Sequence, residues 1–269
     1  IYRDNDLKNH LVEQGGFFLP LQQLLKKQNI MSGINFNELF KQFDQLNVLV
    51  IGDVMIDSYV WGKVDRISPE APVPVVTVGR RENSLGGASN VVKNLKAMGA
   101  TPILCTVIGD DDQANVFEQL IQALHIPTDG ILKSKERVTT TKFRVMGNNT
   151  QMLRVDEETI KDLTADEFSS LSKSIETRIN SQKIDVIIFE DYDKGIITPE
   201  LIQFVNQIAI KNKIPVAVDP KKKNFTAFKG VTLFKPNLKE LREGLKMDIS
   251  PDNINELQRA ISSFRVKQK

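Results

Sequence analysis

Residues 48–57, Val-Leu-Val-Ile-Gly-Asp-Val-Met-Ile-Asp, constrain the fold more than any other part of this chain. Four consecutive apolar residues, mostly β-branched, predict a strand buried on both faces, which is typical of the middle of a parallel sheet. Gly52 ends this strand, because glycine allows a sharp turn of the backbone. Open α/β sheets bind ligands at the carboxyl ends of their strands, so Asp53 and Asp57 form either a polar turn or part of a site.

Length and composition exclude several classes of protein. The 269 residues fit one large or two small domains, and the formal net charge of +2 comes without a basic block that would indicate nucleic-acid binding. Cys105, the single cysteine, lies in an apolar run, which predicts a buried core residue and excludes a disulfide framework. No stretch reaches the roughly 18 apolar residues of a membrane span, and no secretory pattern opens the chain. We therefore expect a cytoplasmic protein without nucleic-acid or membrane partners.

The chain divides into a flanking segment and one α/β domain. Residues 1–30 are mostly polar, and Met31 is a natural start. We interpret 1–30 as a flanking or artificially added extension, with a helical hairpin as the structural alternative. Residues 31–269 alternate between apolar runs and helical periodicity, which predicts an α/β domain with a mostly parallel sheet. The expected strands are 48–51, 102–108, 186–189, 215–218 and 231–234, and the expected helices are 36–46, 88–98, 113–124, 165–181, 199–211 and a last one after residue 251.

Two segments, near 58–78 and 138–156, depart from this alternation. The first contains three prolines within six residues, at 69, 72 and 74, which exclude a helix and a central strand. The second has a hairpin pattern, with two alternating runs around Met-Gly-Asn-Asn-Thr at 146–150. Together they predict a small second sheet outside the main α/β layer, which acts as a lid. Its apolar face is expected to pair with a second subunit. Tyr59, Trp61, Phe143 and Val145 are the side chains expected on that face.

Polar residues follow four of the predicted strands. They are Asp53, the pair Glu190-Asp191, Asp219, and Asn237 after Lys235-Pro236. In a parallel sheet these strand ends share one edge, so the side chains are expected to converge there. Any one of them alone is more often a turn or a helix cap. Their convergence favours an active site.

Cations and a glycine pair extend the same site. Lys142, Arg144 and Arg154 lie on the predicted hairpin, while Lys194 and Lys221 follow strand ends. Lys and Arg hold phosphates, and Asp and Asn side chains suit sugar hydroxyls or hydrated Mg²⁺, although surface solvation is the alternative for each cation. Gly86-Gly87, before a helix, permit close approach of a ligand to the backbone. The pattern indicates phosphoryl transfer without a Walker loop or a G-x-G-x-x-G fingerprint.

Several motifs together resemble the ribokinase-like (PfkB) sugar kinases, and among them the kinases of D-glycero-β-D-manno-heptose 7-phosphate. The likeness runs from about 46 to 245, and Arg-Ile-Ser-Pro-Glu-Ala-Pro-Val-Pro-Val, at 66–75, is its most specific part. The resemblance implies a three-layer ribokinase-like fold with a β-sheet lid, often used for dimerisation. It also implies ATP and Mg²⁺ as cofactors, and a heptose 1,7-bisphosphate as product in ADP-heptose (lipopolysaccharide core) synthesis. The other motifs that carry it are Gly52-Asp53-x-x-x-Asp57, Gly86-Gly87-Ala88-x-Asn90, Thr141-Lys142-Phe143-Arg144-Val145, Asp191-Tyr192-x-Lys194-Gly195, Asp219-Pro220-Lys221 and Pro236-Asn237-x-x-Glu240.

The resemblance also implies roles for individual residues. On the acceptor side, one set of residues contacts the sugar, with Asp53 close by. A second set lines the acceptor site and its 7-phosphate. The Asn237-x-x-Glu240 motif is implied to organise Mg²⁺ and the nucleotide phosphates, with Glu240 as the residue for the metal. The implied substrate-binding residues are Asp53, Asp57, Gly86, Gly87, Asn90, Lys142, Arg144, Arg154, Asp191 and Lys194, and the implied cofactor-binding residues are Asp219, Lys221, Asn237 and Glu240.

One departure from the family pattern affects catalysis. The family carries a Gly-Ala-Gly-Asp run that supplies the anion hole and the catalytic base, and nothing after Asn237 matches it. We therefore assign no catalytic residue, and expect a kinase domain that lacks its C-terminal part. Asp193 and Lys222 replace the usual alanine and glycine. Two alternatives remain: another ribokinase-like kinase for a sugar or a nucleoside, or a non-catalytic sugar- or nucleotide-binding fragment.

Overall fold

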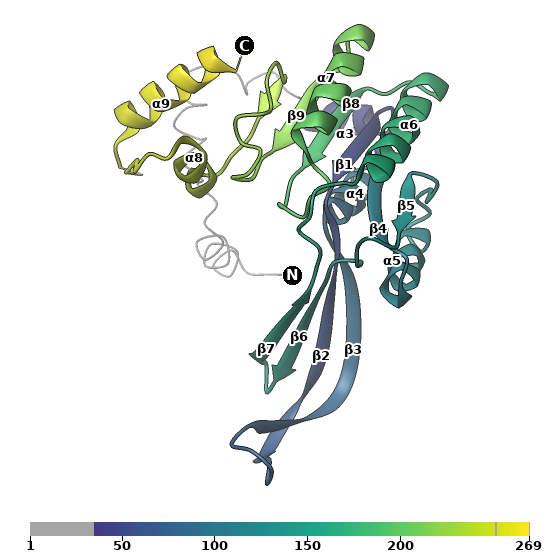
Figure 1. Ribbon diagram of the computed structural model, residues 1–269, viewed down its shortest axis with the longest axis vertical. Helices are drawn as coiled ribbons and strands as arrows, with labels where there is room; N and C mark the ends of the chain where they lie inside the picture. The colour runs from purple at the N-terminus through teal and green to yellow at the C-terminus, as the bar shows by residue number, and fades with distance from the viewer. Residues whose placement is uncertain (1–34, 251, 269) are drawn as a thin grey trace.

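The computed structural model describes residues 35–250 and 252–268, so the expected extension over 1–30 lies outside the described part. The core consists of three layers, with a parallel sheet between two layers of helices (Figure 1). The strand order is β10-β9-β8-β1-β4-β5, which places β1 (Asn47–Gly52) inside the sheet. The predicted fold class is therefore confirmed. The remaining strands of this sheet are β4 (Thr101–Gly109), β5 (Ile131–Ser134), β8 (Val186–Glu190), β9 (Val216–Asp219) and β10 (Leu233–Phe234).

Side chains of β1 alternate between the two helical layers, as a strand buried on both faces must. Leu49 and Ile51 join the core beneath α6 (Ala165–Ser181) and α7 (Pro199–Asn212). Val48 and Val50 join the core beneath the other two helices. Cys105 is fully buried and free, as the apolar run predicted. The helices on this second face are α4 (Ala88–Ala97) and α5 (Asp112–Gln122).

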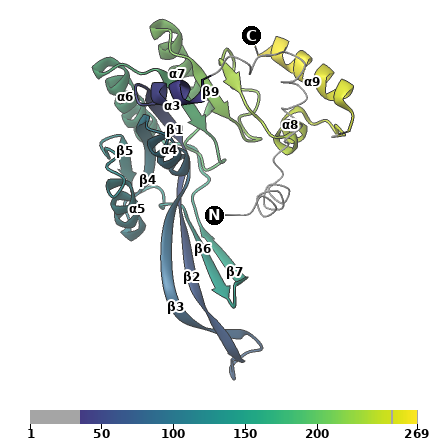
Figure 2. The same cartoon turned by 180° about the vertical axis from the view of Figure 1, so that it is seen from behind.

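A second sheet of four strands projects from the core (Figures 1 and 2). Its order is β3-β2-β6-β7, and β2 starts directly after Asp53, so this lid is continuous with the central strand. The proline-rich segment forms the turn between β2 and the edge strand β3, and Asn148 and Asn149 form the hairpin turn with φ of 51° and 65°. The sequence predicted both features but underestimated the length of the first two strands. The lid strands are β2 (Val54–Ile67), β3 (Pro74–Gly87), β6 (Thr141–Gly147) and β7 (Thr150–Glu157).

The four side chains expected on one apolar lid face lie on two faces. Tyr59 pairs in register with Arg144, whereas Phe143 pairs with Val155 on the opposite face. Tyr59 stacks on Trp61, and the Arg144 guanidinium lies 5.2 Å from the Tyr59 ring. Hydrophobicity alone does not assign a face, because a shift of one residue moves a side chain to the other side of the sheet. The apolar face consists of Val60, Phe143, Val145, Leu153 and Val155.

The C-terminal part differs most from the expectation. β10 contains only two residues, and α8 (Leu238–Leu245) was not predicted. With α9 (Ile254–Lys267), α8 closes a small third core around Phe225. Two more elements complete the described part: β5, which was also not predicted, and α3 (Phe36–Phe43), which precedes β1. No helix among the described residues is long and apolar enough to cross a membrane.

Candidate functional site

The polar residues that follow the strands lie at one edge of the central sheet. Gly52 pairs in register with Glu190, which in turn pairs with Asp219. Asp53 and Asp191, the next residues of their strands, hydrogen-bond through their backbone N–H groups to Glu190 and Asp219 respectively. The predicted convergence at the carboxyl ends of the strands is therefore present.

Asp53 is only 1% exposed, and both of its carboxylate oxygens are used within the protein. Oδ2 accepts hydrogen bonds from the backbone N–H groups of Tyr192 at 2.8 Å and Lys194 at 3.1 Å, and Oδ1 accepts one from Ile196 at 3.1 Å. Burial raises the pKa of Asp53, and these three N–H groups oppose the rise. The Asp53 backbone oxygen accepts from Ala88 N–H, so one residue connects the loop after β8 with the start of α4.

Asp191 is equally enclosed. Oδ1 accepts a hydrogen bond from the backbone N–H of Asp193 at 2.9 Å, and Oδ2 accepts one from the Asn224 amide at 3.1 Å. Burial raises the pKa of Asp191 to about 7, and the nearby charge of Asp53 adds to the rise. The left-handed φ of 56° at Asp193 bends this loop, so that Lys194 follows within the same turn.

Asp57 and the glycine pair lie side by side, where β2 and β3 approach α4. A Cβ atom at Gly86 would lie 2.7 Å from Asp57 Oδ2, so a larger residue there would displace this carboxylate. Gly87 has a φ of 58°, which favours glycine, and it is the residue from which α4 starts. Asn90 is exposed on the first turn of α4. The residues implied for sugar binding are thus neighbours in space.

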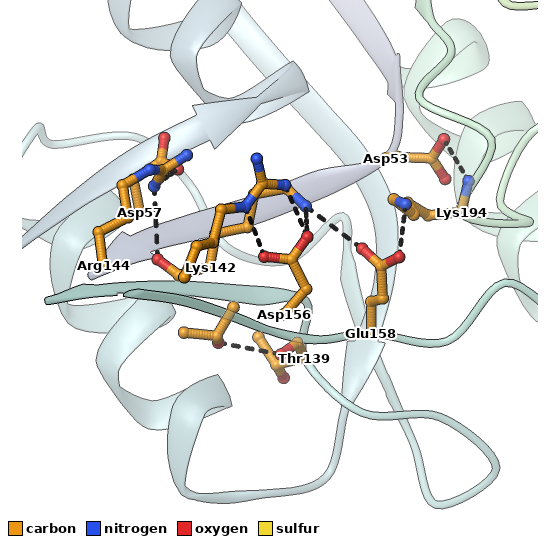
Figure 3. Close-up of polar contacts among 10 residues, drawn as sticks. Asp53, Asp57, Thr139, Lys142, Arg144, Asp156, Glu158 and Lys194 are labelled. Atoms are coloured by element: carbon orange, nitrogen blue, oxygen red, sulfur yellow. Dashed lines mark hydrogen bonds and ion pairs between the residues drawn. The ribbon is translucent and has the colours of Figure 1, made fainter. Parts of the chain in front are cut away.

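The four implied cations of the acceptor side come from three elements and converge on a chain of ion pairs (Figure 3). Arg144 Nη1 donates to Asp57 Oδ1 at 2.5 Å. Arg154 forms two hydrogen bonds to Asp156, at 2.7 and 2.6 Å. Lys142 Nζ lies 2.9 Å from Asp156 Oδ2, which joins β6 to β7. The fourth cation, Lys194, approaches from the core and contacts Glu158 at 2.8 Å.

Sequence reasoning missed two of the carboxylates in these ion pairs, Asp156 and Glu158. They belong to the acidic run Asp-Glu-Glu at 156–158, which by composition is typical of a solvated surface. The Arg154 hydrogen bonds come first among the causes that hold the pKa of Asp156 well below its usual value, followed by Lys142. For Glu158, burial acts to raise the pKa, but Lys194 and Lys142 outweigh it and the pKa is lowered. Both carboxylates are therefore ionised at neutral pH.

Arg137 is a third residue that the sequence did not reveal. It is buried, and its Nε donates to Glu167 at 3.0 Å. Its other nitrogens donate to the backbone oxygens of Lys161 at 3.1 Å and Lys194 at 3.4 Å. Arg137 therefore adds to the support that Asp53 gives the loop that carries Lys194.

The residues implied for the nucleotide gather around the start of α8. Asn237 caps this helix, since its Oδ1 accepts from Glu240 N–H at 2.8 Å while Glu240 Oε2 accepts from Asn237 N–H at 2.7 Å. The other Glu240 oxygen is paired with Lys221, and Lys235 lies 2.9 Å from Asp219. The helix cap accounts structurally for both residues of the Asn-x-x-Glu motif, and it leaves their side chains at the same sheet edge as Asp219.

The resemblance implies Glu240 for Mg²⁺, and in this structure both of its oxygens are engaged, one by the Asn237 N–H and the other by Lys221. Among residues 35–250 and 252–268, no group of three or more His, Cys, Asp or Glu side chains is placed to hold a metal ion. Mg²⁺ that is bound mainly through substrate phosphates and water needs only one or two carboxylates, so Glu240 would hold it on releasing Lys221. Burial raises the pKa of Glu190 to about 7, and the charges of Asp219 and Glu240 add to the rise.

An apolar groove of about 1060 Å³ adjoins this half rather than the acceptor cations. Lys235 and Asn237 are among the residues that line it. Its apolar lining comes from β10 and α9 and includes Phe234, Leu257 and Phe264. The acceptor half, by contrast, is an array of charged side chains on one face of the lid and on the loop that carries Lys194.

Comparison with known families decides how this edge is interpreted. Residues 45–268 match the pfkB family of carbohydrate kinases. The chain belongs to this family. The matched region contains β1, the lid and all the residues named above, so the kinase residues implied by the sequence motifs lie within the family domain.

Curated proteins similar in sequence to this chain include several with the name "Bifunctional protein HldE". The relative from Aliarcobacter butzleri is 42% identical over 207 residues, which are 77% of this chain and 43% of that protein. The one from Helicobacter pylori strain G27 is 41% identical over 202 residues, 75% of this chain and 43% of that protein. This chain thus spans less than half the length of the curated relatives it matches.

Solved structures confirm the fold. Phosphofructokinase-2 from Escherichia coli, in its tetrameric inhibited form, superposes with a TM-score of 0.61 at 18% identity, covering 82% of this chain and 71% of that chain. A putative sugar kinase from Clostridium perfringens gives a TM-score of 0.59 at 18% identity, covering 83% and 68%. At this identity the likeness establishes the ribokinase-like fold alone.

Proposed function

We propose that the protein of which this chain is part transfers the γ-phosphoryl group of MgATP to D-glycero-β-D-manno-heptose 7-phosphate, giving the 1,7-bisphosphate. The observation that carries the proposal is the convergence of four cations, Lys142, Arg144, Arg154 and Lys194, beside Asp57. A neutral sugar needs no such array, whereas Lys and Arg are the side chains that hold phosphate groups. The relatives named HldE support a heptose phosphate over other sugar phosphates.

On the acceptor side, Asp57, the backbone at Gly86-Gly87 and Asn90 would contact the sugar. They lie where β2, β3 and α4 meet, and a carboxylate and an amide suit sugar hydroxyls. The lid cations would hold the 7-phosphate. Asp53 and Asp191 would shape this side from beneath, because their oxygens are bound to the loop at 192–196 and to Asn224.

On the nucleotide side, Asn237 and Glu240 would organise Mg²⁺ and the phosphates of ATP. Asp219 and Lys221 lie between this half and the acceptor half, and Lys221 Nζ lies 5.4 Å from the Tyr192 ring. Phosphoryl transfer depends on positioning and on electrostatic stabilisation. A metal ion together with Lys221 would supply the positive charge for that stabilisation. A bound Mg²⁺ would supply neutralisation of the charge on the phosphates.

The apolar lid face would form a dimer in a cytoplasmic protein. Leu153 and Val155 are 56% and 50% exposed, and they lie on the face opposite the charged acceptor side. Pairing with a second copy would cover this face, since exposed apolar patches mark interaction surfaces.

Acceptor choice is tested by calorimetric titration of this chain with heptose 7-phosphate, fructose 6-phosphate, ribose and adenosine. We expect measurable binding of heptose 7-phosphate, about tenfold weaker binding for Lys142→Met, and no change for Lys135→Met in an exposed turn. ADP release by the full gene product with the same panel tests turnover. Preference for fructose 6-phosphate, ribose or adenosine in kcat/KM would overturn the assignment.

A further inference from the structure

Glu158 connects the lid to the core through two lysines. It follows directly after β7, where the lid chain returns to the core. Its Oε1 lies 2.8 Å from Lys194 Nζ on the loop after β8, and its Oε2 lies 3.3 Å from Lys142 Nζ on β6. Figure 3 shows this carboxylate between the two ammonium groups. Each oxygen of Glu158 is therefore used by a different cation.

Each of the four cations of the acceptor side is already paired with a carboxylate of the protein. They face three carboxylates, Asp57, Asp156 and Glu158. A phosphate group that enters therefore competes with a carboxylate for these cations, because none of the four lies without an acidic partner. Glu158 and its two lysines are partly buried, with Glu158 at 23% exposure, so their charges are screened less than on an open surface.

The three carboxylates differ in how firmly they are held. Asp57 lies in β2, between Gly86 and Arg144. Asp156 lies in β7, and its two oxygens take two hydrogen bonds from Arg154 and one from Lys142. Glu158 lies outside the strand and is held by the flexible ends of two lysines. Of the three, Glu158 can leave with the smallest rearrangement of the backbone.

We propose that Glu158 is the resident counter-ion of the acceptor phosphate: in the free protein it holds Lys142 and Lys194, and the phosphate displaces it and takes over both lysines. This inference rests on the proposed function, in that the acceptor carries a phosphate. Glu158 then determines specificity, because an unphosphorylated sugar has no charge with which to displace a carboxylate. The residue acts through the two lysines and needs no contact with the sugar.

The test uses Glu158→Gln, which keeps the shape of the side chain and removes its charge. Glu157→Gln is the matched control, since it makes the same change of net charge one residue away, at an exposed position. By removing a competing charge about 3 Å from both lysines, Glu158→Gln is expected to tighten binding of heptose 7-phosphate and inorganic phosphate by roughly 5- to 20-fold at low salt. Glu157→Gln should stay within about twofold, because exposed charges interact weakly.

A double-mutant cycle separates this role from a general effect on the fold. In a Lys142→Met, Lys194→Met background, Glu158→Gln should leave phosphate affinity unchanged, because the carboxylate then has no lysine to release. Unchanged or weaker phosphate binding by Glu158→Gln in the parent chain would overturn the inference. So would the same gain in the background without the lysines.

The outcomes also distinguish the inference from the proposed function. If heptose 7-phosphate binds and Glu158→Gln does not tighten it, the counter-ion role fails and the proposed acceptor stands. If another sugar phosphate binds better and Glu158→Gln tightens that one, the acceptor is wrong and the counter-ion role stands. If no phosphorylated compound, inorganic phosphate included, binds to the parent chain or to Glu158→Gln, both fail.

Discussion

The Asp53 carboxylate, at the end of β1, accepts a hydrogen bond from the backbone N–H of Lys194 at 3.1 Å, across 141 residues of sequence. The same carboxylate binds the N–H groups of Tyr192 and Ile196. The position of the Lys194 ammonium group, and with it the ion pair to Glu158, therefore depends on a buried acid that is almost inaccessible to solvent.

The first prediction concerns the stability that this contact supplies. Asp53→Ala leaves three enclosed N–H groups without their acceptor, and we expect it to lower the free energy of unfolding by about 3–5 kcal/mol. Chemical denaturation measures the change. Asp185→Ala is the control, because Asp185 accepts the Asn47 N–H at 2.9 Å at the other end of β1, and its loss should cost only about 1 kcal/mol. Equal losses for the two variants would contradict the prediction.

Features encoded by local patterns were predicted from the sequence. The apolar run before Gly52 specified a central strand, and the Asn148-Asn149 turn specified the β6–β7 hairpin. The convergence of Asp53, Glu190 and Asp219 followed from the rule that parallel strands share one edge. In each case the information lies within a few residues of chain, or in the general geometry of parallel sheets.

Features that depend on register or on distant partners were not predicted. Tyr59 and Phe143 occupy opposite lid faces because of strand pairing, which a single sequence does not specify. Glu158 is part of an acidic run, and only folding brings Lys142 and Lys194 to its two oxygens. The helix α8 was missed although Asn237 and Glu240 form a capping box, because both residues were interpreted as a nucleotide motif.

The second prediction is a dependence of stability on pH. The pKa of Glu190 is raised from 4.5 to about 7 in the folded protein, chiefly by burial. Between these values the folded state binds more protons than the unfolded state, so the free energy of unfolding should fall as the pH rises from about 4.5 to 7. Asp191, with a pKa raised to about 7, contributes in the same direction.

Comparison with Glu190→Gln isolates this contribution. The variant cannot ionise at this position, so its stability should exceed that of the parent increasingly toward pH 7, by roughly 2–3 kcal/mol. Denaturation curves at several pH values for the parent, Glu190→Gln and the exposed-site control Glu157→Gln provide the measurement. A constant difference between parent and Glu190→Gln across this range would show that Glu190 does not carry the effect.

The third prediction tests the lid as a dimer interface. Val155→Glu places a charge on the apolar lid face beside Phe143, and we expect it to weaken self-association at least about tenfold. Gln151→Glu introduces the same charge on the other face of β7, where Gln151 pairs with Met146 beside Trp61, and should leave the dimer intact. Light scattering at micromolar concentration follows the oligomeric state. A monomeric parent chain, or equal loss for both variants, would exclude pairing through this face.

The last prediction is that these 269 residues bind the sugar phosphate without turning it over. A general base must be free to take a proton from the acceptor. The described carboxylates of the acceptor side are already engaged, Asp53 and Asp191 by enclosed hydrogen bonds and Asp57 by Arg144. No Gly-Ala-Gly-Asp run follows Asn237 to supply another base or an anion hole. The absence of a positioned base costs about 10²–10⁴-fold and that of an anion hole roughly 10²–10³-fold, although the two losses need not multiply.

A coupled ADP-release assay on this chain, with the full gene product as control, measures the difference. A similar kcat for both proteins would place the base within residues 1–269, and Asp191, whose pKa is raised to about 7, would then be the first residue to replace.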